Sequence, residues 1–199
     1  MKKNLFIVIE GVDGAGTTTQ ATLLAARIFE NFKEAKILLT REPTGGKYGK
    51  QIRQMLKKGK SPKLLGDKFL NLFVKDRAEH LNYLKNIKSI IISDRHKHST
   101  YAYQQAQGVS FEKIHLKHHN FTAPDLTVII DIPINDAIRR MKGKKNKEMF
   151  DKHHRFLNDV RTFYLKLNKQ LKEPIAVVDG LGTKEQVANR IWKKVKKLL

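Results

Sequence analysis

The chain has 199 residues, of which 40 are lysine or arginine and 19 are aspartate or glutamate, and its formal net charge is +21 at pH 7. The absence of cysteine excludes a disulfide framework and thiolate metal sites, and no apolar run is long enough for a membrane span or a signal peptide, so we expect a cytoplasmic protein of one domain. The charge favours anionic partners such as nucleotides or nucleic acid, but the lysines are dispersed and no nucleic-acid-binding motif is present, so we expect no specific nucleic-acid partner.

Residues 5–20 combine a short apolar run, a glycine-rich turn and a segment suited to a helix. Gly11, Gly14 and Gly16 allow backbone N–H groups to converge on an anion without interference from a Cβ atom. The following helix would point the positive end of its dipole at the same anion. The pattern predicts a strand, a phosphate-binding loop and a helix. A tight turn without a ligand is the less favoured alternative.

The loop departs from the usual phosphate-binding motif at one position. The spacing fits G-x-x-x-x-G-K-[ST], except that Thr17 stands where the lysine belongs. Thr18 follows at the position where a hydroxyl would be a ligand of Mg²⁺. The loop is therefore expected to bind phosphate through its backbone, without contributing a positive charge.

The rest of the chain alternates predicted strands with predicted helices. In chain order, the strands are expected at residues 5–9, 36–40, 88–93, 126–132 and 174–179. The helices are expected at residues 21–32, 51–58, 65–84, 99–107, 111–121, 134–141, 150–171 and 183–198. This alternation predicts a parallel sheet with helices on both faces, and right-handed crossovers make a three-layer α/β fold the simplest arrangement.

Charged residues follow two of these strands. Arg41 comes after the second strand, and Asp94 and Arg95 come after the third. Ligands of open α/β sheets bind at the carboxyl ends of the strands, and arginine binds anions in a bidentate manner. These strand ends are therefore candidates for a ligand site, in which Arg95 is an anion binder beside the acid Asp94.

Phe73 and Arg77 are four residues apart on a predicted helix. This spacing places an aromatic ring and a planar cation on the same helical face. The pair could bind a planar ligand, but taken alone it favours the other account, a core phenylalanine beside a surface ion pair.

The densest basic cluster lies at residues 139–147 and contains Gly143. A glycine inside such a cluster suggests a hinged segment, and we predict a mobile basic lid at about residues 139–151. The alternative is a solvated, disordered run of charges.

Several motifs together resemble the thymidylate kinase family along essentially the whole chain. The matching stretches are IEGVDGAG at 9–16, REP at 41–43, FVKDRAEH at 73–80, DRH at 94–96, STYAYQ at 99–104 and PDL at 124–126. The resemblance implies a P-loop NTPase-like fold with a five-stranded parallel sheet. It also implies transfer of the ATP γ-phosphoryl group to dTMP, which gives dTDP for dTTP synthesis, with Mg²⁺ as cofactor and a homodimer as the usual assembly.

The resemblance assigns roles to individual residues of this chain. ATP would contact the loop residues Gly11, Val12, Asp13, Gly14, Ala15, Gly16, Thr17, Thr18 and Thr19. The dTMP molecule would contact Arg41, Phe73, Arg77, Arg95, Thr100, Tyr103 and Gln104. Arg41 and Arg95 would bind its phosphate, and Tyr103 would exclude a ribose 2′-hydroxyl. Phe73 would stack on thymine, while Arg77 and Thr100 would contact the edges of the base. Mg²⁺ would be held by Thr18 and, through water, by Asp94, while Asp13 approaches the sugar 3′-hydroxyl and the metal network.

Two departures from the family pattern affect the chemistry. Thr17 replaces the loop lysine, and residues 148–151 read EMFD where the family often has an arginine between acidic residues. Charge for the transition state must then come from elsewhere, and the lid is the obvious source. The expected catalytic residues are Asp13, Arg95, Arg140, Lys142 and Lys144, with Lys145 and Lys147 as further lid candidates.

Three alternatives remain open from the sequence. The first is a kinase that acts on another nucleoside monophosphate or on a deoxynucleoside. The second is a weakly active or inactive nucleotide-binding relative, because Thr17 replaces the lysine. The third is a non-catalytic protein that binds nucleotides or nucleic acid, which the charge of +21 makes conceivable.

Overall fold

The computed structural model describes residues 4–57, 65–141 and 154–199. The strands of this part of the chain are β1 (Leu5–Gly11), β2 (Ile37–Arg41), β3 (Ile90–Asp94), β4 (Leu126–Asp131) and β5 (Ile175–Asp179). The helices are α1 (Thr17–Asn31), α2 (Lys47–Lys57), α3 (Gly66–Leu84), α4 (Lys97–Ala106), α5 (Phe111–His118), α6 (Ile134–Met141), α7 (His154–Gln170) and α8 (Lys184–Val195).

The strands form one parallel sheet in the order β2-β3-β1-β4-β5. Strand β1 is central, and its residue Ile7 is opposite Ile92 of β3 on one side and Leu126 of β4 on the other. All seven residues of β1 are buried, as expected for a parallel strand that is covered on both faces. The predicted parallel α/β fold is confirmed.

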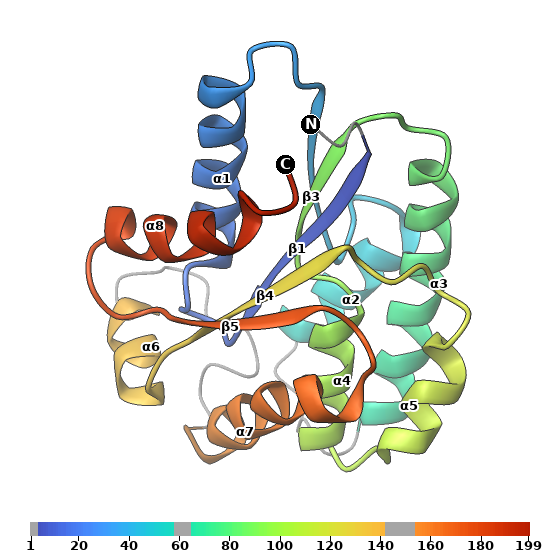
Figure 1. Cartoon of the computed structure of the whole chain (residues 1–199). Coiled ribbons are helices and arrows are strands. Elements are labelled where there is room, and N and C mark those ends of the chain that lie inside the picture. The colour runs from blue at the N-terminus through green and yellow to red at the C-terminus, as the bar shows by residue number, and fades with distance from the viewer. Residues whose placement is uncertain (1–3, 58–64, 142–153) are drawn as a thin grey trace.

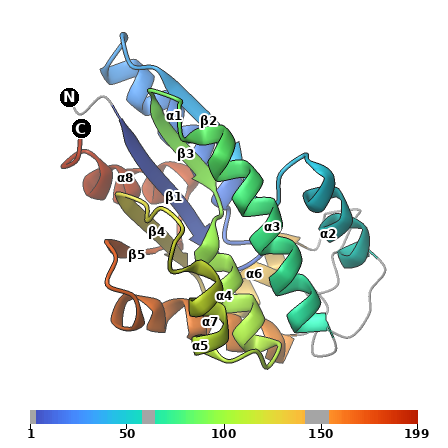
Figure 2. The same ribbon diagram turned by 90° about the vertical axis from the view of Figure 1, so that its right-hand side faces the viewer.

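Helices cover both faces of the sheet (Figure 1). Helices α1 and α8 pack against each other and cover one face. Helices α4 and α7 cover the other face, with α3 and α5 packed beside α4, as the turned view in Figure 2 also shows. This arrangement leaves the carboxyl ends of the strands at one edge of the sheet, where the loops that follow them meet.

Two helices begin four residues earlier than the hydrophobic pattern predicts. Helix α1 begins at Thr17 and α2 begins at Lys47. The first turn of α1 reads TTTQ and the first turn of α2 reads KYGK, so neither carries the apolar spacing by which a buried helical face is recognised. Both first turns lie close to the loops at the sheet edge, where polar residues are expected.

Glu173 connects the segment between α7 and β5 to the start of α4. One carboxylate oxygen lies 2.7 Å from Nζ of Lys97, and the other lies 3.2 Å from Nε2 of His98. Lys97 is buried, with only 3% of its surface exposed. Burial alone would raise the pKa of Glu173, but the hydrogen bonds from His98 and Lys97 hold the pKa at about 2.

We expect the Glu173→Gln variant to lose stability in a pH-dependent way. The folded pKa of Glu173 lies below the unfolded value of 4.5, so its contribution is complete above that value and is lost as the pH falls toward 2. The free energy of unfolding should drop by about 2 to 3 kcal/mol at pH 7 and by less than half of that near pH 3. Urea unfolding of both proteins at the two pH values measures this. Equal losses at both would show that the ion pair is not the cause.

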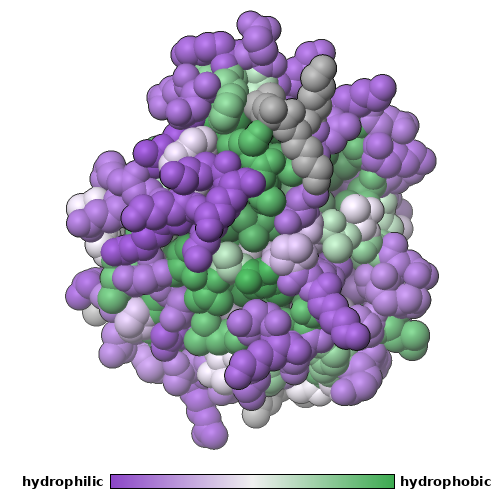
Figure 3. Space-filling view, viewed as in Figure 1, coloured by the Kyte–Doolittle hydropathy of each residue, from purple (hydrophilic) through white to green (hydrophobic). Residues whose placement is uncertain are grey.

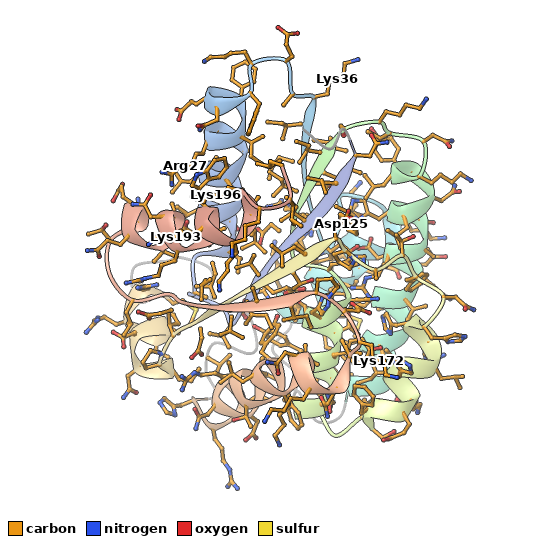
Figure 4. All side chains as sticks on the ribbon, in the orientation of Figure 1. Arg27, Lys36, Asp125, Lys172, Lys193 and Lys196 are labelled. Atoms are coloured by element: carbon orange, nitrogen blue, oxygen red, sulfur yellow. The ribbon has the colours of Figure 1, made fainter. Side chains whose placement is uncertain are left out.

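The surface carries most of the charge of the protein. Figure 3 shows that hydrophilic residues cover most of one face and that hydrophobic residues appear near its middle, where β4 and β5 run. Figure 4 shows Lys193 on α8, Lys196 at its C-cap and Arg27 on α1, all on the same side of the molecule. No helix in the described part of the chain is both long and apolar enough to cross a membrane.

Candidate functional site

A cavity of about 690 Å³ opens at the carboxyl ends of β1, β2 and β3. Its wall is built from the loop after β1, the ends of β2 and β3, α2, the end of α6 and the segment before α8. The lining residues that the argument below uses are Asp13, Gly14, Ala15, Gly16, Thr17, Thr18, Arg41, Arg53, Asp94, Arg95, Arg140, Gly180 and Gly182. The cavity is therefore lined by residues 13–19 of the predicted phosphate loop and by both charged strand ends.

The loop after β1 has the backbone of an anion-binding loop. Gly14 and Gly16 have φ values of 89° and 95°, in the left-handed region that favours glycine. A Cβ atom at Gly14 would lie 2.5 Å from the carbonyl oxygen of Ala137, so this glycine also permits α6 to approach. Gly16 is the N-cap of α1 and, without a side chain, makes no capping hydrogen bond to the N–H groups of the first turn. These N–H groups are available to an anion.

The positive charge that the phosphate loop lacks is present on Arg140 of the neighbouring helix α6. Thr17 is buried, with 7% of its surface exposed, and its side chain has no charge. Nη2 of Arg140, on α6, donates to the carbonyl oxygen of Gly180 at 3.0 Å, and Nη1 lies 3.5 Å from the carbonyl oxygen of Ala15 in the loop. A guanidinium group therefore lies against the phosphate loop. The other lid candidates, Lys142, Lys144, Lys145 and Lys147, lie outside the described residues.

Thr18 and Asp94 form the pair that the sequence predicts for a magnesium ion. The hydroxyl of Thr18 donates to Oδ2 of Asp94 at 2.5 Å. The other oxygen, Oδ1, is buried without a hydrogen-bond partner among the described residues. Mg²⁺ is commonly held by one or two protein oxygens together with waters and substrate phosphates, and the described residues contain no cluster of three or more histidine or acidic side chains that could hold a metal alone. The unpaired carboxylate oxygen therefore fits a magnesium ion that arrives with a nucleotide.

Arg95 extends from the end of β3 into the cavity. It is the only non-glycine residue of the described chain with a positive φ, 73°, a sparsely populated conformation that is often found at functional sites. Its guanidinium group donates to Oδ1 of Asp13 at 2.5 Å and to Oγ of Ser99 at 3.3 Å, and it lies 5.5 Å from the centre of the Tyr103 ring. The sequence predicted Asp13, Arg95 and Tyr103 separately, and the structure brings the three together.

Two further arginines complete this end of the cavity. Arg41 lines it from the end of β2, where the sequence predicted an anion-binding residue. Arg53 of α2 also lines it and donates to the carbonyl oxygens of Pro43 and Thr44. Sequence reasoning missed Arg53, because it lies in a helix that also carries Lys50 and Lys57 and nothing in the pattern separates it from these lysines.

The predicted base-binding residues lie on α3 and α4, deeper than the cavity lining. Arg77 and Thr100 are each 1% exposed and contact each other, with Nη2 of Arg77 donating to the Thr100 hydroxyl at 3.1 Å. Gln104 is also 1% exposed and Tyr103 is 7% exposed. Phe73 is partly buried and packs against the core, 6.2 Å from the ring of Phe69. The alternative in which Arg77 belongs to a surface ion pair is wrong, because its partners are buried.

Those partners are Glu42 and His118. Nε and Nη2 of Arg77 lie 2.8 and 2.7 Å from Oε2 of Glu42. Nη1 lies 2.6 Å from Nε2 of His118, whose Nδ1 lies 2.7 Å from the carbonyl oxygen of Ile114. Because a carbonyl only accepts, Nδ1 of His118 carries the proton and Nε2 accepts from Arg77. Burial and the charge of Arg77 lower the pKa of His118 to about 2, which keeps its ring neutral.

Glu42 holds three side chains through one buried carboxylate. Besides Arg77, its Oε1 contacts Nδ1 of His80 at 2.9 Å and Nδ1 of His96 at 3.0 Å. Burial would raise the pKa of Glu42, but Arg77 and the hydrogen bonds from the histidines hold it well below its usual range. Burial lowers the pKa of His96 to about 4 although Glu42 opposes this. The negative charge of Glu42 is therefore balanced mainly by Arg77.

The fold and the cavity define a class of protein: a P-loop nucleotide-binding protein with arginines lining the cavity wall that faces the loop. The sequence profile of the thymidylate kinase family matches residues 9–191. A probable thymidylate kinase of Thermococcus onnurineus is 37% identical, with 94% of this chain and 95% of the relative covered. Probable thymidylate kinases of Thermococcus kodakarensis and Pyrococcus abyssi are 36% and 37% identical, with 98% of this chain and at least 97% of each relative covered. The chain belongs to the thymidylate kinase family.

Proposed function

We propose that this protein transfers the γ-phosphoryl group of ATP to dTMP and thereby forms dTDP. The observation that carries this proposal is one cavity with a glycine-rich loop at one end and arginines at the other. The first end is lined by residues 13–19 with Arg140 beside them, and the other end holds Arg41, Arg53 and Arg95. A donor triphosphate and an acceptor monophosphate would meet between these ends.

The reaction makes limited chemical demands on the protein. An oxygen of the acceptor phosphate attacks the γ-phosphorus of ATP, and the bond from the γ-phosphorus to the β,γ-bridging oxygen breaks. A nucleoside monophosphate is largely a dianion at neutral pH, so no base is needed to generate the nucleophile. Catalysis then depends on positioning and on neutralising the charge of the phosphates. Arginines on both sides of the transferred group meet this demand.

On the donor side, the free N–H groups at the start of α1 and the glycine backbone would hold the ATP phosphates. The hydroxyl of Thr18 and the unpaired Oδ1 of Asp94 would hold Mg²⁺, directly or through water. The metal supplies charge neutralisation between the phosphates. Gly180 and Gly182 line the same end and would border the adenine.

On the acceptor side, Arg95 and Arg41 would bind the dTMP phosphate, and Arg53 is positioned to contribute. Asp13, which already contacts Arg95, would approach the sugar 3′-hydroxyl. Tyr103 lies beneath Arg95 and would occupy the space that a 2′-hydroxyl requires. Selection against a ribonucleotide would thus come from a wall adjacent to the phosphate site.

Phe73, Arg77, Thr100 and Gln104 would recognise the base. Phe73 would stack on thymine, while Arg77 and Thr100 would contact its edges. Because a guanidinium group can only donate hydrogen bonds, Arg77 would favour the O4 oxygen of thymine over the amino group that cytosine carries at the same position. The contacts of Arg77 to Glu42 and His118 hold the guanidinium plane in place for this role.

The organisation of the chain is part of the same proposal. Residues 1–199 would form one kinase domain with a basic lid at about residues 139–151. The enzyme would be a cytoplasmic homodimer, as the resemblance to the family implies. A kinase of another nucleoside monophosphate and an inactive relative are the alternatives that the experiment below must separate.

A coupled assay of ADP release tests the proposal. Each of dTMP, dUMP, dCMP, dGMP and UMP is offered with ATP, in the presence of Mg²⁺ and again with excess chelator. We expect the highest kcat/KM with dTMP and no turnover without the metal. A higher value with another monophosphate would reassign the substrate. Binding to DNA that falls steeply with salt, without turnover on any monophosphate, would instead identify a nucleic-acid-binding protein.

A further inference from the structure

Glu10 is a buried carboxylate on β1 that the mechanism above does not use. It is fully buried, with 0% of its surface exposed. Oε1 accepts the backbone N–H of His96 at 2.8 Å and that of Ser99 at 3.1 Å. Oε2 accepts the hydroxyl of Ser99 at 2.6 Å and that of Tyr164 at 2.9 Å. All four contacts are donors, which is the environment of an ionised carboxylate, because this form only accepts.

These contacts cap the start of α4. His96 is the N-cap residue of α4 and makes no capping hydrogen bond with its own side chain. The N–H groups of His96 and Ser99 are at the start of the helix, where the i to i−4 bonds of the helix interior are missing. The Ser99 N–H has only a long 3.2 Å contact with the carbonyl oxygen of His96 besides its bond to Glu10. Glu10, on β1, accepts hydrogen bonds from both N–H groups and adds a negative charge at the positive end of the helix dipole. The cap thus fixes where α4 begins relative to β1.

Arg95 immediately precedes this capped turn. Its positive φ of 73° directs the chain from β3 into α4 and directs its side chain into the cavity. Glu10 bonds the backbone N–H of the next residue, and Ser99 forms a second connection. The Ser99 hydroxyl donates to Glu10 and accepts from Nη1 of Arg95 at 3.3 Å. The N–H of Arg95 donates to the carbonyl oxygen of Ile9 at 2.9 Å, and its guanidinium group also contacts Asp13. Glu10 adds to these contacts by holding the residue that follows Arg95 and, through Ser99, one nitrogen of the guanidinium group.

We propose that Glu10 is a positioning residue for recognition of the acceptor: it holds the 95–99 turn so that Arg95 reaches the acceptor phosphate. This inference rests on the proposed function, in which Arg95 binds the phosphate of dTMP. Loss of Glu10 should therefore weaken the binding of dTMP and not that of ATP, because the ATP end of the cavity is lined by residues 13–19 and the end of α6. A role in general stability would not separate the two substrates.

The test measures dissociation constants of dTMP and of ATP by calorimetry for the parent, Glu10→Ala and Glu10→Gln. We expect Glu10→Ala to weaken dTMP about 10- to 100-fold, as a misplaced binding group does, and to change the constant for ATP less than about threefold. The Gln variant keeps an oxygen for the two backbone N–H groups, while both hydroxyls can turn to accept from its amide, so it should stay much closer to the parent. Glu173→Gln is the matched control, because it also removes a largely buried carboxylate that bonds α4 but has no contact with Arg95.

A double-mutant cycle with Arg95→Ala decides whether Glu10 acts through Arg95. If it does, adding Glu10→Ala to Arg95→Ala should weaken dTMP little further. Additive losses, or equal losses for ATP and dTMP, would overturn the inference and leave the proposed function intact. A parent that binds no monophosphate would overturn both. Should Glu10→Ala fail to fold, Ser99→Ala removes the hydroxyl that connects Glu10 to the guanidinium group and leaves the bonds of Glu10 to the two backbone N–H groups and to Tyr164. It should weaken dTMP, but not ATP, in the same direction.

Discussion

Replacing Arg95 by alanine should reduce kcat/KM for dTMP by about 10²- to 10³-fold, and it should do so for every monophosphate that the enzyme accepts. A bidentate contact between a guanidinium group and a phosphate is worth about 2 to 4 kcal/mol when it is removed from a partly desolvated site. The contact involves the phosphate and not the base, so the ranking of substrates should be preserved. Steady-state kinetics with dTMP, dUMP and UMP measures this.

Two variants make the Arg95 result interpretable. Arg77→Ala removes an arginine from the proposed base-binding side, and it should reduce kcat/KM selectively for thymidylate. Arg27→Ala removes an arginine from α1, where it stacks on Trp192 and bonds Asn189 away from the cavity, and it should leave the kinetics close to those of the parent. If Arg95→Ala bound dTMP as tightly as the parent, the assignment of the acceptor phosphate site would be wrong.

Replacing Arg140 by glutamine should lower kcat by about 10²- to 10³-fold and change KM for ATP much less. The phosphate loop contains no lysine or arginine, and a cation near the transferred group typically contributes several powers of ten in rate. Arg140 is the lid candidate within the described residues, and its guanidinium group lies 3.5 Å from the loop carbonyl of Ala15. Single-turnover kinetics with saturating ATP and dTMP separates this effect from substrate binding.

The Thr17→Lys substitution provides the complementary test. Placed in the Arg140→Gln background, it should restore part of the lost kcat, because it returns a cation to the loop itself. Arg139→Gln is the matched control, since the Arg139 side chain is 77% exposed and pairs with Asp136. If the parent binds both nucleotides without turnover and Thr17→Lys alone creates activity, then Arg140 does not replace the missing loop lysine. That result would identify an inactive relative.

The order of the elements and the position of the phosphate loop could be predicted from the amino-acid sequence alone. Both depend on local rules: apolar runs of strand length alternate with helical periodicity, and glycines occur where positive φ values are needed. The parallel sheet could be predicted from this alternation. Arg41, Asp94 and Arg95 could be identified as site candidates because they follow predicted strands, and ligands bind at the carboxyl ends of strands. The early starts of α1 and α2 were not predicted, because a polar first turn carries no apolar periodicity.

The contacts between charged residues could not be predicted in the same way, because they depend on how distant segments pack. Glu10 lies within an apolar strand, and nothing in its neighbours shows that it caps a helix that begins 87 residues later, at Lys97. Arg53 has the same local pattern as the lysines around it, yet it alone of them lines the cavity. Arg77 could be read as an exposed residue until its contacts with Glu42 and His118 placed it in the interior. Periodicity reports which face of an element is buried, whereas the partner of a buried charge depends on packing between segments far apart in the chain.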